Sequence, residues 1–303
     1  MQKFAKNRNC RNISIIWFVI LAIPLFADFS QVTYEFSPEP IDVVIPCAPK
    51  DTITLEACIE GIRKNGSNIR RVIVISREPL TNQAEWFNEL EYPFSVDDLA
   101  QEIGDLTRLK TRMGWIFQQF LKLYAPFVIP GISSNVLILD ADVIFLNPVK
   151  FMNEKGEPFF NVGNEYYEPY FKHAARLLPN LHRVHSGYSG VCHYMLFQRP
   201  ILEDLFAQIS SRHECEPWQA LCRCIDVEEP LSPLSEYEIY FNFALLRTNQ
   251  SKIRPLKWVN TGGWGKMETY RKQKYIYMAC QEWIRALGDR IVQIHQGGRG
   301  CLN

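Results

Sequence analysis

The sequence carries no excess of charge of either sign. Lys and Arg together number 33 among the 303 residues, and Asp and Glu also number 33, so the formal net charge is zero. Proteins that bind nucleic acid normally present a basic field, so we expect no nucleic-acid partner. The chain also lacks repeats and low-complexity segments, and 47% of its residues are hydrophobic. This composition is typical of a globular protein with a substantial core, in one large or two modest domains.

No Cys-x-x-Cys pair occurs among the nine cysteines. The densest group of metal-ligating residues is His213, Cys215, Cys222 and Cys224, which fall within twelve residues. Four such side chains suit a small zinc site, although their spacing matches no common zinc pattern. Free thiols and a local disulfide are the alternatives, and the sequence leaves the choice open.

The N-terminal region lacks an apolar run of the usual membrane-spanning length. Residues 13–27 are apolar apart from one serine, and four basic residues precede them. About fifteen residues fall short of the roughly twenty that a spanning helix needs, which suits a signal peptide or a short, tilted anchor. Residues 25–27 form a poor cleavage site because Leu25 is bulky. We therefore predict that residues 1–30 are a signal-anchor that makes the protein membrane-associated. Cleavage would export the protein instead, and a buried helix is the alternative.

A β-α-β unit follows a linker over residues 31–40. Residues 41–45 are a strongly apolar strand that Pro46 ends, a helix is predicted to about residue 65, and residues 71–76 form the next strand. Such units give parallel strands joined by a right-handed crossover. The sequence therefore predicts an α/β fold with a mostly parallel sheet flanked by helices.

Two carboxylates interrupt the next apolar strand. Residues 136–139 and 143–146 are apolar, and Asp140 and Asp142 lie between them. Ligands of open α/β sheets bind at the carboxyl ends of the strands, and paired carboxylates there suit Mg²⁺ or Mn²⁺. The alternative is a β-turn in which one Asp caps the next element and the other is solvated.

A helix predicted over residues 111–124 presents a second, polar stripe beside its apolar one. The stripe consists of Arg112, Trp115, Gln119 and Lys122. One interpretation is a solvated surface. The other is that Arg112 and Lys122 approach a phosphate while Trp115 stacks. We expect Pro126 and Pro130 to end this helix.

Three later segments hold further candidates. Ser186, Gly187 and Gly190 lie in a loop that suits a sugar or phosphate contact, or is a plain turn. Ser235 and Glu238 have the spacing of a capping box, which starts a helix and leaves Glu236 in its first turn. Glu236 is our candidate general base, with a solvent-exposed acid as the alternative.

The last candidate is a histidine near the C-terminus. His295 follows a strand predicted over residues 290–294 and precedes a glycine-rich turn, where it is well placed as a metal ligand or phosphate contact. A helix is predicted before that strand, running from Tyr275 through Met278 and Trp283 to its end at Gly288.

The β-α-β start at IDVVIP, the Asp-x-Asp strand, the glycine-containing loop, the acidic helix start and the late histidine together resemble GT-A fold glycosyltransferases. More closely, an uncharacterised bacterial family of GT-A-like proteins is similar in four blocks in the same order: RMGWIFQQFLKLYA, LILDADVIFLNP, SGYSGVCHYMLFQRPIL and PLSEYEIYFNFAL. The resemblance covers roughly residues 40 to 300. It implies a single catalytic domain in which residues 41–150 bind a nucleotide-sugar and residues 151–303 bind the acceptor.

The resemblance also implies the chemistry. Asp140, Asp142 and His295 would hold Mn²⁺ or Mg²⁺ at the donor diphosphate, and in an inverting enzyme Glu236 would deprotonate an acceptor hydroxyl. In a retaining enzyme, which is the alternative, Glu236 would not be the base. The donor-binding residues would be Pro46, Arg112, Trp115, Gln119, Lys122 and Asp140. The expected partners are therefore a nucleotide-sugar donor and a glycan or other hydroxyl acceptor. A scaffold or carbohydrate-binding protein without turnover is the competing hypothesis. A nucleotidyltransferase is less favoured, because residues 47–50 are not the glycine-rich loop that such enzymes usually carry.

Overall fold

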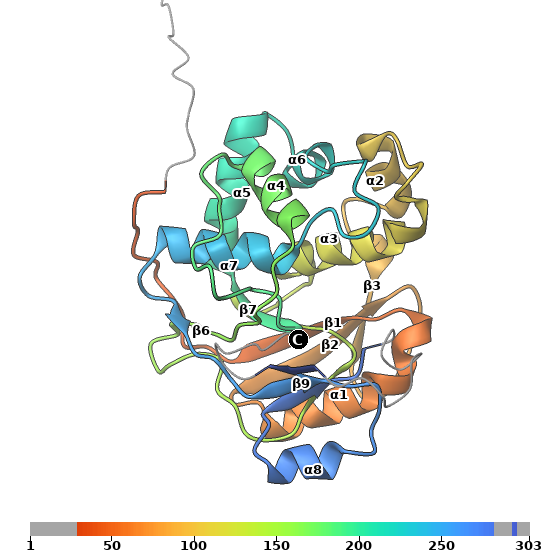
Figure 1. Cartoon of the computed structure of the whole chain (residues 1–303), viewed down its shortest axis with the longest axis vertical. Coiled ribbons are helices and arrows are strands. Elements are labelled where there is room, and N and C mark those ends of the chain that lie inside the picture. The colour runs from red at the N-terminus through yellow and green to blue at the C-terminus, as the bar shows by residue number, and fades with distance from the viewer. Residues whose placement is uncertain (1–28, 282–292, 296–303) are drawn as a thin grey trace, which may run out of the picture.

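A computed structural model describes residues 29–281 and the backbone of residues 293–295. Its centre is a five-stranded sheet in the order β3-β2-β1-β4-β7 (Figure 1). The strands are β1 (Ile41–Pro46), β2 (Ile69–Ser76), β3 (Glu85–Asn88), β4 (Asn135–Leu139) and β7 (Tyr194–Gln198). The first four run parallel, and β7 runs antiparallel to β4. The predicted mostly parallel α/β sheet is therefore confirmed.

The sheet is covered on both faces because its central strands β1 and β4 are apolar apart from Asp42 and Asn135 near their N-terminal ends. Every residue of β1 and β4 is buried, and alternate residues of each strand enter two separate cores. Val44 and Ile138 face a thick layer of helices, whereas Val43 and Leu137 face a single helix and a second sheet. Figure 1 shows the helical layer above the sheet. Its members are α2 (Val96–Ile103), α3 (Met113–Val128), α4 (Glu168–Leu177), α5 (Arg199–His213), α6 (Pro217–Arg223) and α7 (Glu236–Arg247).

The opposite face packs on α1 (Thr52–Asn65) and on a four-stranded sheet in the order β11-β9-β10-β5. These strands are β5 (Val143–Phe145), β9 (Trp258–Asn260), β10 (Tyr277–Ala279) and β11 (Gln293–His295). The smaller elements are β6 (Phe159–Phe160), β8 (Lys252–Ile253), α8 (Met267–Lys272) and 3₁₀ turns at Pro49–Asp51, Glu89–Glu91 and Lys110–Arg112.

Neither the helix predicted from Tyr275 to Gly288 nor the predicted signal-anchor is confirmed. The helix predicted to include Met278 is wrong there, because that residue pairs with Ile144 of β5 in a buried strand. The rest of that prediction, at Trp283 and Gly288, lies outside the described residues. Within the described part, no helix is long and apolar enough to cross a membrane. The predicted signal-anchor over residues 1–30 lies almost wholly outside it.

Pro126 does not end α3, although the helix does end shortly before Pro130 as expected. The helix continues for two more residues and ends at Val128. Phe127, in this last turn, stacks on Phe206 of α5 with ring centroids 5.1 Å apart. This packing keeps the turn helical although Pro126 donates no backbone hydrogen bond.

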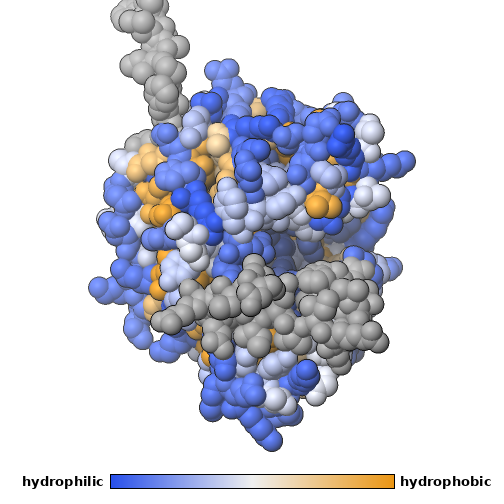
Figure 2. Space-filling model, viewed as in Figure 1, coloured by the Kyte–Doolittle hydropathy of each residue, from blue (hydrophilic) through white to orange (hydrophobic). Residues whose placement is uncertain are grey.

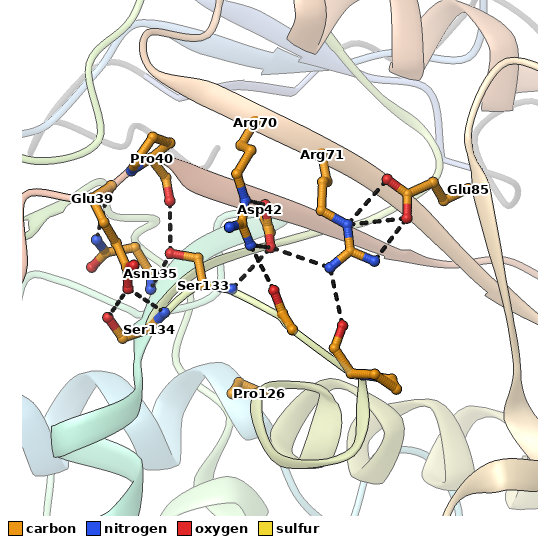
Figure 3. Close-up of polar contacts among 12 residues, drawn as sticks. Glu39, Pro40, Asp42, Arg70, Arg71, Glu85, Pro126, Ser133, Ser134 and Asn135 are labelled. Atoms are coloured by element: carbon orange, nitrogen blue, oxygen red, sulfur yellow. Dashed lines mark hydrogen bonds and ion pairs between the residues drawn. The ribbon is translucent and has the colours of Figure 1, made fainter.

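A buried carboxylate fixes the connection from α3 to β4, at the end of the sheet opposite the strand carboxyl ends. Asp42 of β1 is fully buried and accepts two hydrogen bonds from Arg70, at 2.8 and 2.5 Å, and one from the backbone N–H of Ser133, at 2.9 Å (Figure 3). Arg70 and Arg71 also donate to the carbonyls of Gly131 and Pro130, just beyond α3. Asp42 therefore holds α3 in place relative to the sheet.

We predict that Asp42→Ala lowers the free energy of unfolding by about 1–3 kcal/mol, because the buried N–H of Ser133 loses its acceptor. Glu85 is the matched control, since it pairs with Arg71 but is half exposed. Glu85→Gln should change stability by no more than about 1 kcal/mol. Urea titration of both variants measures the difference, and equal losses would contradict the assignment.

Candidate functional site

The predicted acidic pair lies at the carboxyl end of β4. Asp140 follows the last residue of the strand, and Asp142 precedes β5, so three residues carry the chain from one sheet to the other. Both side chains line a cavity of 360 Å³ whose walls come from α3, α7 and the segment just before β7. Figure 2 shows that the described atoms on this face of the molecule are largely hydrophilic.

Lys122 of α3 is the central side chain of this cavity. Its ammonium lies 2.6 Å from Oδ1 of Asp140 and 2.7 Å from Oε1 of Glu236, and its side chain is only 3% exposed. The ring of Tyr237 lies against it, 4.6 Å from the nitrogen to the ring centroid, and the Tyr237 hydroxyl donates to Asp140 at 3.2 Å. Gln119 is also buried. For these two residues the solvated-surface interpretation is therefore wrong.

Burial and charge act against each other in this cluster. Burial alone disfavours ionised Asp140, but the charge of Lys122 and the nearby imidazole of His193 outweigh it and hold the pKa of Asp140 at about 2. Burial also opposes the charge of Lys122, yet Asp140 and Glu236 together raise its pKa above the usual range. Burial raises the pKa of Glu236, and Lys122 offsets only part of that rise. Asp140 and Lys122 are therefore both charged at neutral pH.

Glu236 lines the cavity as predicted, but it does not point freely into it. Its side chain is 2% exposed and its carboxylate is paired with Lys122. Ser235 starts α7 as expected and accepts the backbone N–H of Glu238 at 3.2 Å. The predicted capping box is wrong in its second hydrogen bond, because the Glu238 side chain does not accept the backbone N–H of Ser235. The Glu238 carboxylate instead accepts hydrogen bonds from Ser189 at 2.5 Å and Asn242 at 2.8 Å.

His193 is a site residue that sequence reasoning did not select. Its Nδ1 lies 3.6 Å from Oδ2 of Asp140, and the amide nitrogen of Gln281 lies 3.0 Å from its Nε2. Its carbonyl accepts the backbone N–H of Asp140 at 3.0 Å. His193 adopts a left-handed backbone with φ of 68°, which is uncommon for a residue other than glycine and recurs at functional sites. Nothing local in the sequence reveals this conformation.

The remaining donor-binding candidates line two adjacent cavities. Arg112 and Trp115 line it, with the guanidinium 4.7 Å from the ring centroid, and Arg112 also donates to the carbonyl of Leu231. Pro46 lines a second cavity of 550 Å³, at the carboxyl ends of β1 and β2. Gln118 of α3 lines both cavities, so they lie side by side.

The proposed sugar or phosphate loop is not part of the cavity lining. Ser186 and Gly187 are exposed, whereas Gly190 is buried against α7. A Cβ atom on Gly190 would lie 2.7 Å from both the Phe241 Cβ and the Tyr237 carbonyl oxygen. Close packing against the helix therefore explains the glycine at position 190.

Comparison with known families identifies the chain. Residues 58–277 match the model described as Family of unknown function (DUF6492). The chain belongs to this family. No curated protein matches it. Among solved structures, the apo structure of the bifunctional glycosyltransferase WbbM is similar with a TM-score of 0.42 and 11% identity, over 83% of this chain and 47% of that one. The chain thus spans about half the length of that protein.

The described residues of this DUF6492 member offer carboxylates but no complete metal cage. They contain no group of three or more His, Cys, Asp and Glu side chains that could hold an ion. Oxygen donors at Asp140 and Asp142 fit Mg²⁺ or Mn²⁺, with the remaining ligands left to a substrate. The backbone of His295 lies in β11, paired with Trp258, but its side chain is outside the described part of the structure.

The cysteine cluster does not form a zinc site. His213 bonds to the carbonyl of Leu177 at 2.8 Å. Cys215, Cys222 and Cys224 are free thiols, and no described group of these residues could hold a metal ion. The zinc and disulfide alternatives are therefore wrong, and free thiols are confirmed.

We predict that Gly190→Ala destabilises the protein by about 1–3 kcal/mol, because overpacking forces α7 or the loop to shift. Gly187→Ala is the matched control, since a Cβ there meets no atom within 4 Å. It should leave the melting temperature unchanged. Thermal unfolding of both variants provides the measurement, and an equal loss in the two would contradict the packing role.

Proposed function

We propose that this protein is a GT-A-like glycosyltransferase that moves a sugar from a nucleotide-sugar donor to an acceptor hydroxyl with the aid of Mn²⁺ or Mg²⁺. The observation that carries the proposal is the pair of adjoining cavities at the carboxyl ends of parallel strands. The larger contains Pro46, Ile75, Leu80 and Phe117, whereas the smaller contains the acidic cluster. Nucleotides bind at this end of open α/β sheets.

The two cavities suit different parts of one donor. The larger, mostly apolar cavity has the volume and lining of a nucleoside site. The smaller begins at Gln118, where a diphosphate leaving the first cavity would enter, and contains Lys122 and both aspartates. When bound there, a divalent ion would neutralise the leaving nucleoside diphosphate.

The acceptor is assigned to the α7 side of the smaller cavity. Glu236 lies there, at the start of the helix, and remains our candidate to take the proton from an acceptor hydroxyl. This role requires the carboxylate to exchange its contact with Lys122 for one with the acceptor. His193 lies across the cavity and orients Asp140.

One observation favours the competing hypothesis of a carbohydrate-binding or scaffold protein without turnover. Lys122 already pairs with both the first aspartate and the candidate base. A cluster whose charges already pair with one another would also suit a protein of this fold that no longer catalyses a reaction. Nucleotide binding separates the two hypotheses, because the scaffold alternative does not require it.

We predict that one of UDP, GDP and CMP binds the protein in isothermal titration calorimetry and that Mn²⁺ is required. Asp142→Asn should weaken this binding about tenfold or more, because a cation loses an anionic oxygen ligand. Asp105→Asn is the control, because Asp105 is exposed and lines neither cavity, and it should bind nucleotide as the wild type does. The absence of binding by all three nucleotides would favour the scaffold alternative. Binding that ignores Mn²⁺ and Asp142 would contradict the metal role.

A second prediction tests the larger cavity. Gly114 lines it, and a Cβ at this position meets no atom within 4 Å. Gly114→Trp should fill the cavity and abolish nucleotide binding while leaving the protein folded, whereas Gly114→Ala should bind nucleotide as the wild type does. The same calorimetry, with circular dichroism for folding, provides the measurement. Wild-type affinity in the folded tryptophan variant would place the nucleoside elsewhere.

A further inference from the structure

The acidic cavity already contains a cation of its own. The Lys122 ammonium contacts Asp140 and Glu236 at hydrogen-bond distance, and the face of the Tyr237 ring covers it from a third side. A lysine is rarely so fully buried unless it is paired. Here both of its partners are residues to which the proposed function gives roles with an ion or an acceptor.

The position of Lys122 sets up a competition. Its ammonium occupies Oδ1 of Asp140, which leaves Oδ2, on the side of His193, as the other oxygen open to an ion. A divalent ion bound to Asp140 would share a small cavity with a fixed positive charge, and repulsion between charges a few ångströms apart is strong in a partly buried site. The free protein therefore disfavours the ion.

A diphosphate would reverse this balance. Gln118, at the boundary of the two cavities, lies one helical turn before Lys122, so both project from the same face of α3. A lysine side chain is long and flexible enough to swing from Asp140 toward an anion at this boundary. Its charge would then attract the ligand while the oxygens of Asp140 became available.

We propose that Lys122 is a built-in counter-ion that competes with the divalent ion for Asp140, so that ion and donor diphosphate bind together rather than separately. This inference rests on the proposed function. It deepens that function by making Lys122 the residue that couples the two ligands. When Asp140 binds the ion, the ion pair with Glu236 keeps Lys122 in the cavity.

The test measures the affinity of Mn²⁺ alone, by electron paramagnetic resonance of the free ion. Lys122→Met should bind Mn²⁺ about tenfold or more tightly than the wild type, because the competing charge is gone. Lys122→Arg keeps the charge and should stay weak. Lys64→Met is the matched control, since Lys64 is an exposed lysine of α1 that does not line the cavity. It should leave the affinity unchanged.

A double variant covers the risk that Lys122→Met does not fold. Lys122→Met/Glu236→Gln removes the lysine together with one carboxylate, and it should still bind Mn²⁺ more tightly than the wild type. Unchanged or weaker affinity in whichever of these variants folds would overturn the inference, as would an equal gain in Lys64→Met. Tight Mn²⁺ binding by the wild type without nucleotide would overturn it as well.

The outcome is separable from that of the proposed function. If no nucleotide binds but Lys122→Met binds Mn²⁺ more tightly, the donor site is refuted and the competition at Asp140 is still supported. If nucleotide binding requires the metal but removal of Lys122 does not change the Mn²⁺ affinity, the proposed glycosyltransferase function is supported. The proposed coupling of ion and diphosphate by Lys122 is then refuted.

Discussion

The ion pairs of Lys122 connect the three parts of the fold that meet at the cavity. Asp140 is on the turn after β4, Glu236 begins α7, and Lys122 lies in the middle of α3. Removing one member of a buried ionic cluster leaves an uncompensated charge, which costs several kcal/mol. The cluster therefore requires α3 and α7 to keep their positions over the sheet. The Asp42 network at the other end of the sheet fixes the connection that follows α3.

Much of the fold could be predicted because its signals are local. The apolar runs of β1 and β4, the three- and four-residue spacing in α1, and Ser235 before α7 each need only a few neighbouring residues. The site was predictable to the same extent, as Asp140 and Asp142 interrupt an apolar strand and Lys122 lies on the polar stripe of a helix. Strand direction alone places Asp140 and Asp142 at the carboxyl end of β4, whereas the contact of Lys122 with Asp140 depends on how α3 packs on the sheet.

The rest depends on contacts between distant parts of the chain. Glu236 is 114 residues from Lys122, so no spacing rule could predict that the candidate base is paired. His193 enters the site through a left-handed backbone, and Gly190 is required by a helix some fifty residues later. The residues around Met278 predict a helix, but pairing with β5 makes Met278 part of a strand. In each case tertiary packing decided what local preference left open.

The turn from Asp140 to Asp142 has a mechanical meaning as well as a chemical one. It is the short link by which the chain leaves the central sheet at β4 and enters the second sheet at β5. The backbone carbonyl of Asp142 also accepts the N–H of Cys280, just beyond β10. The two layers are therefore joined at the residues that carry the carboxylates. A ligand bound to both carboxylates would therefore contact the short link that joins the two sheets.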